Sequence, residues 1–150
     1  MAHVFKFYFF LFAFVLIIVS KVRLCGRRVV GGVAEGEALV SACKISFLGG
    51  IDPKRGVVVD PSLDIFGESV AGKVLVFEGG KGSTVGSYVI YQLKKHRKSP
   101  VAFVVRRADT IVAVGAIIAE IPTVELPHGE IKSGEEVLVN GTEGFVELRR

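Results

Sequence analysis

The sequence predicts an α+β domain, a compact β-rich barrel or sandwich with helices on one side. Short apolar runs of strand length recur after Val22, separated by turns rich in glycine and proline. Two longer segments, 84–96 and 110–119, have the features of helices. The chain closes with extended segments on either side of Asn140-Gly141, a strong hairpin signal. With 150 residues, the chain suits one domain with a substantial core.

The predicted strands are short because glycine and proline interrupt the apolar runs every few residues. Gly31-Gly32 and Gly36 break the first runs, and Asp52-Pro53-Lys54-Arg55-Gly56 forms a turn with proline in the favoured second position. Asp60-Pro61-Ser62 closes a later strand. In chain order, the strands are expected at 28–30, 37–40, 45–48, 57–59, 74–77, 101–105, 136–139 and 145–148.

The two predicted helices each begin next to a capping residue. In the first, 84–96, apolar residues recur at helical spacing, and Ser83 or Thr84 is expected at the N-cap position. Asp109 is expected to cap the second helix, 110–119, which ends ahead of a proline. In chain order, the helices are the next predicted elements after the strands at 74–77 and 101–105.

A glycine-rich stretch, Gly79-Gly80-Lys81-Gly82-Ser83-Thr84-Val85-Gly86-Ser87, joins the strand at 74–77 to the first helix. Free backbone N–H groups and the positive end of the helix dipole would converge on whatever sits above Ser83. Such a turn suits an anion, or an oxygen that must carry negative charge. Glycines in a tight turn can also serve only to relieve backbone strain. The local sequence leaves both interpretations open.

Neither common nucleotide-binding loop fits this stretch. A Walker A loop needs Gly-Lys followed directly by Ser or Thr, and here Gly82 intervenes. The dinucleotide pattern G-x-G-x-x-G can be placed on Gly80 and Gly82 only if Gly86 is accepted one residue late. No alternating Rossmann pattern surrounds these glycines. We therefore do not expect a nucleotide site.

Longer motifs occur in order along the chain: Ile-Ser-Phe-Leu-Gly-Gly-Ile-Asp-Pro over 45–53, Gly-Glu-Ser-Val-Ala-Gly-Lys-Val-Leu over 67–75, and Gly-Lys-Gly-Ser-Thr-Val-Gly-Ser-Tyr over 80–88. Shorter matches follow at 108–111, 115–117 and 121–122. This ordered series resembles the small, swivelling subunit of the aconitase X family, over nearly everything after residue 21. The resemblance implies the swivelling β/β/α fold, a barrel-like domain as in the mobile domain of aconitases.

The resemblance also implies an activity. It implies a cytoplasmic hydro-lyase that dehydrates (R)-5-phosphomevalonate to trans-anhydromevalonate 5-phosphate in the archaeal mevalonate pathway. The chain would act only in a heterodimer with a large aconitase-X-like subunit. Two alternatives remain: a dehydratase of another hydroxy acid, such as cis-3-hydroxyproline, and a non-catalytic module tethered to a membrane.

In the family, the serine of the Gly-Lys-Gly-Ser-Thr motif is the proposed catalytic base, which implies this role for Ser83. The neighbouring Gly80, Lys81, Gly82 and Thr84 are then expected to bind substrate. A helix terminus stabilises an oxyanion by up to ~2 kcal/mol, about one and a half pKa units, which is too little to ionise a serine alone. Backbone donors and a cation from the partner would have to supply the rest.

A second loop offers a further candidate, Asp52 of the Gly-Gly-Ile-Asp motif, which could orient a substrate hydroxyl. More often such an aspartate simply holds an Asp-Pro turn. Arg106 and Arg107 follow a predicted core strand, so one of them could reach an anionic substrate. The sequence also departs from the family pattern at Glu78-Gly79 and Asp64-Ile65, which leaves the exact substrate open.

The small number of cysteines argues against a metal site on this chain. An iron–sulfur cluster is usually held by several cysteines, and only Cys25 and Cys43 are present. Their separation matches no zinc-ligand pattern. We therefore expect no metal ligands on this chain. The family resemblance implies an iron–sulfur cluster, a 4Fe-4S cluster, in the large subunit.

The formal net charge of +4 is mild, and the basic clusters lack interleaved aromatic residues, so nucleic-acid binding is not expected. The apolar run 7–19 is shorter than the ~20 residues that span a bilayer. It has the length of a signal-peptide core, but no small-residue cleavage site follows. We interpret 1–21 as an extension from a misassigned start, or an anchor, and 22–150 as the domain. The misassigned start is the preferred interpretation, so membrane binding is not expected.

Overall fold

The computed structural model describes residues 20–150, so the apolar run at 7–19 lies outside the described residues. Eight strands form one mixed sheet, and their bounds are β1 (Lys21–Cys25), β2 (Arg27–Val30), β3 (Val33–Val40), β7 (Val74–Phe77), β9 (Ala102–Val105), β10 (Thr123–Glu125), β11 (Glu136–Asn140) and β12 (Phe145–Arg149). Their order is β1-β12-β11-β3-β7-β9-β10-β2. Strands β3, β7, β9 and β10 are parallel, and the outer pairs are antiparallel.

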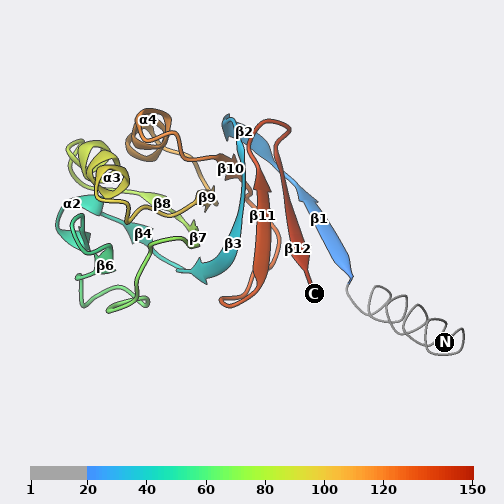
Figure 1. Ribbon diagram of the computed structural model, residues 1–150, viewed down its shortest axis with the longest axis horizontal. Coiled ribbons are helices and arrows are strands. Elements are labelled where there is room, and N and C mark those ends of the chain that lie inside the picture. The colour runs from blue at the N-terminus through green and yellow to red at the C-terminus, as the bar shows by residue number, and fades with distance from the viewer. Residues whose placement is uncertain (1–19) are drawn as a thin grey trace, which may run out of the picture.

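Shorter elements are attached to one side of this sheet. Strand β4 (Lys44–Ile45) pairs in parallel with β8 (Gly79–Gly80), and β5 (Ile51–Asp52) pairs antiparallel with β6 (Val57–Val58). The helical segments are α2 (Phe47–Gly50), α3 (Gly86–Lys95) and α4 (Thr110–Ile118). In Figure 1, α3 and α4 lie on one side of the central strands, whereas β11, β12 and β1 lie on the other.

The central strands are buried on both faces because alternate side chains enter two different cores. Leu75, Phe77 and Phe103 point into the core beneath the helices. Val74 and Val76 point into the core enclosed with β11 and β12. The rings of Phe77 and Phe103 meet edge to face, 5.4 Å apart, and hold β7 and β9 together at the helical side. These layers confirm the predicted α+β class and its swivelling β/β/α architecture.

The first strands are longer than predicted. Strand β3 runs through Gly36, which was expected to break it. A Cβ on Gly36 would lie 2.9 Å from the carbonyl oxygen of Gly72 and 3.1 Å from the side chain of Val101. Glycine is therefore present for close packing and does not end the strand. Two strands of the eight-stranded sheet, β1 and β10, were not predicted, although Lys21–Cys25 alternates charged and apolar residues. The short strands β5 and β8 were not predicted either.

The prediction of a strand over 45–48 is wrong after Ile45. Leu48 (φ −70°, ψ 118°) and Gly49 (φ 80°, ψ −10°) have the dihedral angles of a type II turn. Glycine at this second central position is what a type II turn requires. The segment labelled α2 therefore reverses the chain and delivers it into β5.

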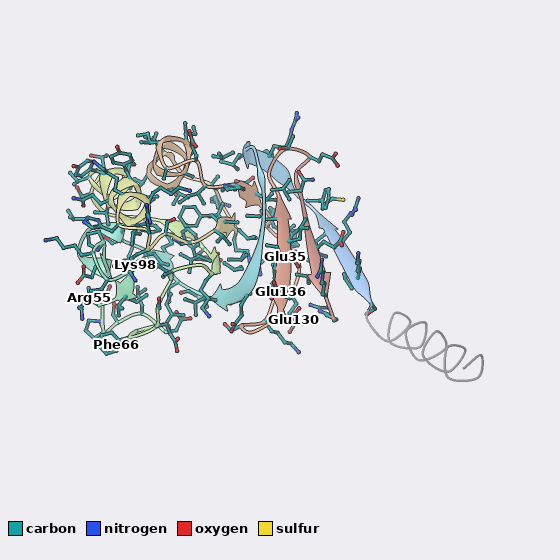
Figure 2. The ribbon with its side chains drawn as sticks, in the orientation of Figure 1. Glu35, Arg55, Phe66, Lys98, Glu130 and Glu136 are labelled. Atoms are coloured by element: carbon teal, nitrogen blue, oxygen red, sulfur yellow. The ribbon has the colours of Figure 1, made fainter. Side chains whose placement is uncertain are left out.

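The closing hairpin is confirmed, with a longer loop than a two-residue turn. Strands β11 and β12 pair in register from Glu136 opposite Arg149 to Asn140 opposite Phe145. The amide of Gly144 donates to the carbonyl oxygen of Asn140 at 2.8 Å. The Asn140 side chain accepts from the amide of Glu143 at 2.9 Å, so it holds the turn. In Figure 2, Glu35 and Glu136 lie beside this part of the sheet, whereas Arg55 and Phe66 lie at the opposite end.

Candidate active site: the glycine loop

The glycine loop, residues 79–85, joins β7 to α3 and is fixed along its first half. Strand β8 pairs with β4, and the amide of Lys81 donates to the carbonyl oxygen of Ile45 at 3.1 Å. From the other side, the amide of Gly80 donates to Oδ1 of Asp109 at 2.8 Å. The loop is therefore held between the β4 segment and the start of α4.

Two glycines of the loop are required by their surroundings. A Cβ on Gly80 would lie 2.9 Å and 3.0 Å from the carboxylate oxygens of Asp109. Gly82 has φ +81°, and a Cβ there would lie 2.7 Å from Oγ of Ser46. These contacts support the interpretation that the glycines relieve steric strain. Any contact of Gly80 or Gly82 with substrate would have to use the backbone, and the Gly80 amide is already bonded.

The helix begins later than predicted. Val85 is the N-cap residue and α3 starts at Gly86, so Ser83 and Thr84 are not the N-cap. Ser83 instead forms the turn that leads into the helix. Its Oγ accepts from the amide of Val85 at 3.2 Å, and its carbonyl oxygen accepts from the amide of Gly86 at 3.0 Å. The Ser83 hydroxyl therefore lies against the start of α3, with its own proton available to another acceptor.

The second half of the loop presents unused donors. Residues 81–85 are all exposed. Within residues 20–150, the amides of Gly82, Ser83 and Thr84 donate no hydrogen bond. Consecutive free amides ahead of a helix make a surface that attracts negative charge. The predicted anion-binding character of this loop is therefore compatible with its backbone geometry.

Lys81 is exposed and lies within electrostatic reach of Asp60. The pKa of the Asp60 carboxyl lies below its usual range because the Ser62 hydroxyl and amide donate to it and because Lys81 is positively charged. Sequence reasoning missed this neighbour, since Asp60-Pro61-Ser62 was interpreted only as a turn. The 60–62 turn therefore contributes an acidic side chain close to the glycine loop.

Asp52 is engaged within its own turn. Its Oδ1 accepts from the amide of Lys54 at 2.9 Å, and its Oδ2 accepts from Nε of Arg55 at 2.8 Å. The Arg55 guanidinium, followed by the Lys54 amide, lowers the pKa of the Asp52 carboxyl. No hydrogen bond links Asp52 to the described glycine loop. A contact of Asp52 with substrate stays a prediction.

Residues 20–150 contain no group of three or more His, Cys, Asp or Glu side chains arranged to hold a metal ion. Cys25 is exposed on β1, and Cys43 is half-buried against the core beneath the helices. These residues do not fit an iron–sulfur cluster. Over the same described range, no helix combines the length and the apolar character needed to cross a membrane.

The swivelling β/β/α layers and the Gly-Lys-Gly-Ser-Thr loop define the class of protein. The model of the aconitase X swivel domain matches residues 23–148, and the chain belongs to this family. The family predicted from the ordered motifs is therefore confirmed.

Named relatives are similar over nearly their whole length. The phosphomevalonate dehydratase small subunit of Thermococcus onnurineus is 58% identical over 127 residues, covering 84% of this chain and 98% of that protein. The protein of the same name from Methanosarcina acetivorans is 53% identical over 131 residues, covering 85% and 91%. The crystal structure of Thermococcus kodakaraensis aconitase X in its holo form aligns with a TM-score of 0.83 and 55% identity, covering 85% of this chain and 98% of that one.

Proposed function

We propose that this chain is the small subunit of a phosphomevalonate dehydratase, a hydro-lyase of the archaeal mevalonate pathway. The substrate is (R)-5-phosphomevalonate and the product is trans-anhydromevalonate 5-phosphate. The observation that carries this proposal is the 58% identity to a relative of that name, along 98% of the relative's length. The chain retains the complete Gly-Lys-Gly-Ser-Thr sequence at 80–84.

In this proposal Ser83 is the catalytic base. Dehydration removes a proton from the carbon next to the carboxylate, and the electrons of that C–H bond form the new double bond. The hydroxyl group on the adjacent carbon leaves, and with one proton it becomes water. Ser83 as the alkoxide takes up the carbon-bound proton, and the Val85 amide, which donates to Ser83 Oγ at 3.2 Å, stabilises the oxyanion before transfer.

Lys81 has a supporting role in the same proposal. Its exposed ammonium group can pair with an anionic group of the substrate. Thr84 has an exposed hydroxyl next to Ser83 and can donate to a substrate oxygen. Gly80 has a positioning role, because the hydrogen bond from its amide to the Asp109 carboxylate fixes the first half of the loop.

The partner in this proposal is a larger subunit, as the name "small subunit" of the relatives implies. The exposed glycine loop supports this, because a base that works on a carbon acid needs a site from which water is excluded. The iron–sulfur cluster would belong to that subunit, since the described residues of this chain do not fit one.

The test is reconstitution of the full chain with its large subunit under anaerobic conditions. Water loss from (R)-5-phosphomevalonate should be observed with the pair and not with this chain alone. Unphosphorylated mevalonate and cis-3-hydroxyproline serve as comparison substrates. Activity of the lone chain, or preference of the pair for cis-3-hydroxyproline, would overturn the proposal. Cell fractionation then tests whether the assembled protein is cytoplasmic.

A further inference from the structure

A second site lies outside the residues assigned above, at the carboxyl ends of β7, β9 and β10. It is a cavity of about 480 Å³, within the size range of small-molecule sites. Its walls are mostly basic. We call it the basic cavity, and it is lined by Lys44, Glu78, Arg106, Arg107, Pro127 and His128.

The strand order explains why these residues meet. Arg106 and Arg107 continue the line of β9, and their amides donate to the carbonyl oxygens of Phe77 and Glu78, both at 3.0 Å. Lys44 reaches the same place from β4, where it pairs with Gly79. Pro127-His128 follows β10, the parallel neighbour of β9. Carboxyl ends of parallel strands are where α/β proteins commonly bind ligands.

The basic cavity carries unbalanced charge. Within residues 20–150, Lys44, Arg106 and Arg107 make no ion pair, and Glu78 makes none either. Arg106 is half-buried, and its one side-chain hydrogen bond runs from Nη1 to the neutral carbonyl oxygen of Leu126 at 3.1 Å. Three cations therefore share one cavity with a single carboxylate, and their mutual repulsion favours an added anion.

Four other arginines are arranged differently. Arg23, Arg27, Arg149 and Arg150 each lie within 3.3 Å of a glutamate oxygen. The sequence suggested that only one of Arg106 and Arg107 would face an anion, whereas both line the basic cavity. Unpaired guanidinium groups next to a lysine are the combination that binds phosphate, because arginine donates two parallel hydrogen bonds to such oxygens.

We propose that the basic cavity binds the phosphate group of a small phosphorylated molecule. Lys44, Arg106 and Arg107 neutralise the phosphate, and Glu78 accepts from a hydroxyl group or holds the lysine. Two sources share this chemistry. One is the substrate's own phosphate, because only the two residues of β8 separate Glu78 of the basic cavity from Lys81 of the glycine loop. This source rests on the proposed function. The other is a separate phosphorylated metabolite.

Binding is tested with inorganic phosphate and the full chain, followed by ¹⁵N NMR of the backbone amides. We expect saturable shifts that include the amides of Glu78, Arg107 and His128.

The exposed cations Lys44 and Arg107 can be replaced without disturbing the core, so Lys44→Gln and Arg107→Gln should each weaken phosphate binding by roughly tenfold or more. Arg149→Gln, which removes a cation from β12, is the matched control and should leave binding unchanged. Absence of saturable shifts, or binding that persists in the Lys44→Gln/Arg107→Gln double variant, overturns the proposal.

Steady-state kinetics of the assembled enzyme separate the two sources. If the substrate's phosphate occupies the basic cavity, Arg107→Gln should raise KM with little change in kcat, and inorganic phosphate should compete with substrate. If a separate metabolite binds there, KM should be unchanged and inorganic phosphate should alter the rate without competing. A wild-type pair that does not dehydrate phosphomevalonate refutes the proposed function, while the NMR titration still decides whether the cavity binds phosphate.

Discussion

The carboxylate of Asp109 joins the glycine loop to the start of helix α4. Its Oδ1 accepts from the amide of Gly80 at 2.8 Å, and its Oδ2 accepts from the amide of Ile111 at 3.0 Å. One side chain therefore caps a helix and fixes the segment that precedes Ser83 by three residues. The missing Cβ of Gly80 makes room for this carboxylate.

Replacing Asp109 by alanine should lower both stability and turnover. The change removes an N-cap and leaves the Gly80 amide without its acceptor, which together should cost about 2 kcal/mol of unfolding free energy. The glycine loop should then shift and reduce kcat in the assembled enzyme. Urea denaturation and steady-state kinetics measure the two effects. Asp109→Asn keeps one acceptor oxygen, so its unfolding free energy and kcat should lie between those of the wild type and Asp109→Ala. Wild-type stability in Asp109→Ala would show that the hydrogen bonds from Gly80 and Ile111 contribute nothing to folding.

Substitution of Gly82 separates backbone strain from steric conflict. Gly82 and Gly49 have nearly the same positive φ, +81° and +80°, so alanine should cost about 1 kcal/mol of backbone strain at either position. Only at Gly82 would the new Cβ collide, 2.7 Å from Oγ of Ser46, whereas nothing lies within 4 Å at Gly49. Gly82→Ala should therefore lower the melting temperature and kcat more than Gly49→Ala. Equal effects of the two substitutions would contradict the contact with Ser46.

Loss of the Ser83 hydroxyl should affect turnover far more than folding. Ser83→Ala removes the acceptor of the Val85 amide, which should cost at most about 1 kcal/mol of unfolding free energy. In the assembled enzyme, kcat should fall by roughly a hundredfold or more, as expected when a general base is lost, with little change in KM. Ser87→Ala is the matched control, because Ser87 Oγ donates to the carbonyl oxygen of Ile111 at 2.8 Å and has no proposed catalytic role. If Ser83→Ala retains most of the wild-type kcat, the base is another group.

Local signals predicted most of the fold. The apolar run at 74–77, the Asp109 cap and the Asn140-Gly141 turn each depend on neighbouring residues, and each lies where it was predicted. Features that depend on distant residues were missed. Gly36 was expected to end a strand. Strand β3 instead continues through Gly36, where the lack of a side chain allows close packing against Gly72.

The same contrast between local signals and contacts of distant residues applies to the candidate site. Turn chemistry located the glycine loop, and the family resemblance singled out Ser83 in it. The sequence could not show that the Gly80 amide is occupied by Asp109, because these residues are 29 positions apart. Nor could it place His128 and Arg107 in one cavity, since that requires the parallel pairing of β9 with β10. Contacts between strands distant in sequence are set by the tertiary fold and have no local pattern.

Asp64 should make stability depend on pH. Burial opposes its ionisation, but hydrogen bonds from the Ser41 hydroxyl at 2.6 Å and the Ala42 amide at 2.8 Å outweigh it, so the pKa of the Asp64 carboxyl lies below its ordinary value of 3.8. A lowered folded-state pKa adds stability that is present above the unfolded-state pKa, about 4, and lost as pH falls through the folded-state pKa.

Asp64 is exposed, so solvent screening limits its contribution: Asp64→Asn should lower the unfolding free energy by less than about 1 kcal/mol at pH 7, and this difference should shrink well below pH 4. Urea denaturation of both proteins at neutral and acidic pH measures the effect. Glu68→Gln changes another exposed carboxylate, one that accepts no side-chain hydrogen bond within residues 20–150, and should have little effect at either pH. A difference between wild type and Asp64→Asn that grows on acidification would contradict this assignment.

Residues 1–21 should be dispensable for folding and activity. Every proposed site residue lies after Val22, and the family model begins at residue 23. A chain that starts at Val22 loses the exposed Lys21–Glu147 ion pair of 3.7 Å, worth less than about 1 kcal/mol, and the two backbone hydrogen bonds between Ser20 and Arg150 at the sheet edge. It should fold, pair with the large subunit and give wild-type kcat. A chain that starts at Ser20 keeps those contacts and is the control for stability. If both truncated chains fail to pair, residues preceding Ser20 contribute to assembly, and the interpretation of 1–21 as an anchor regains support.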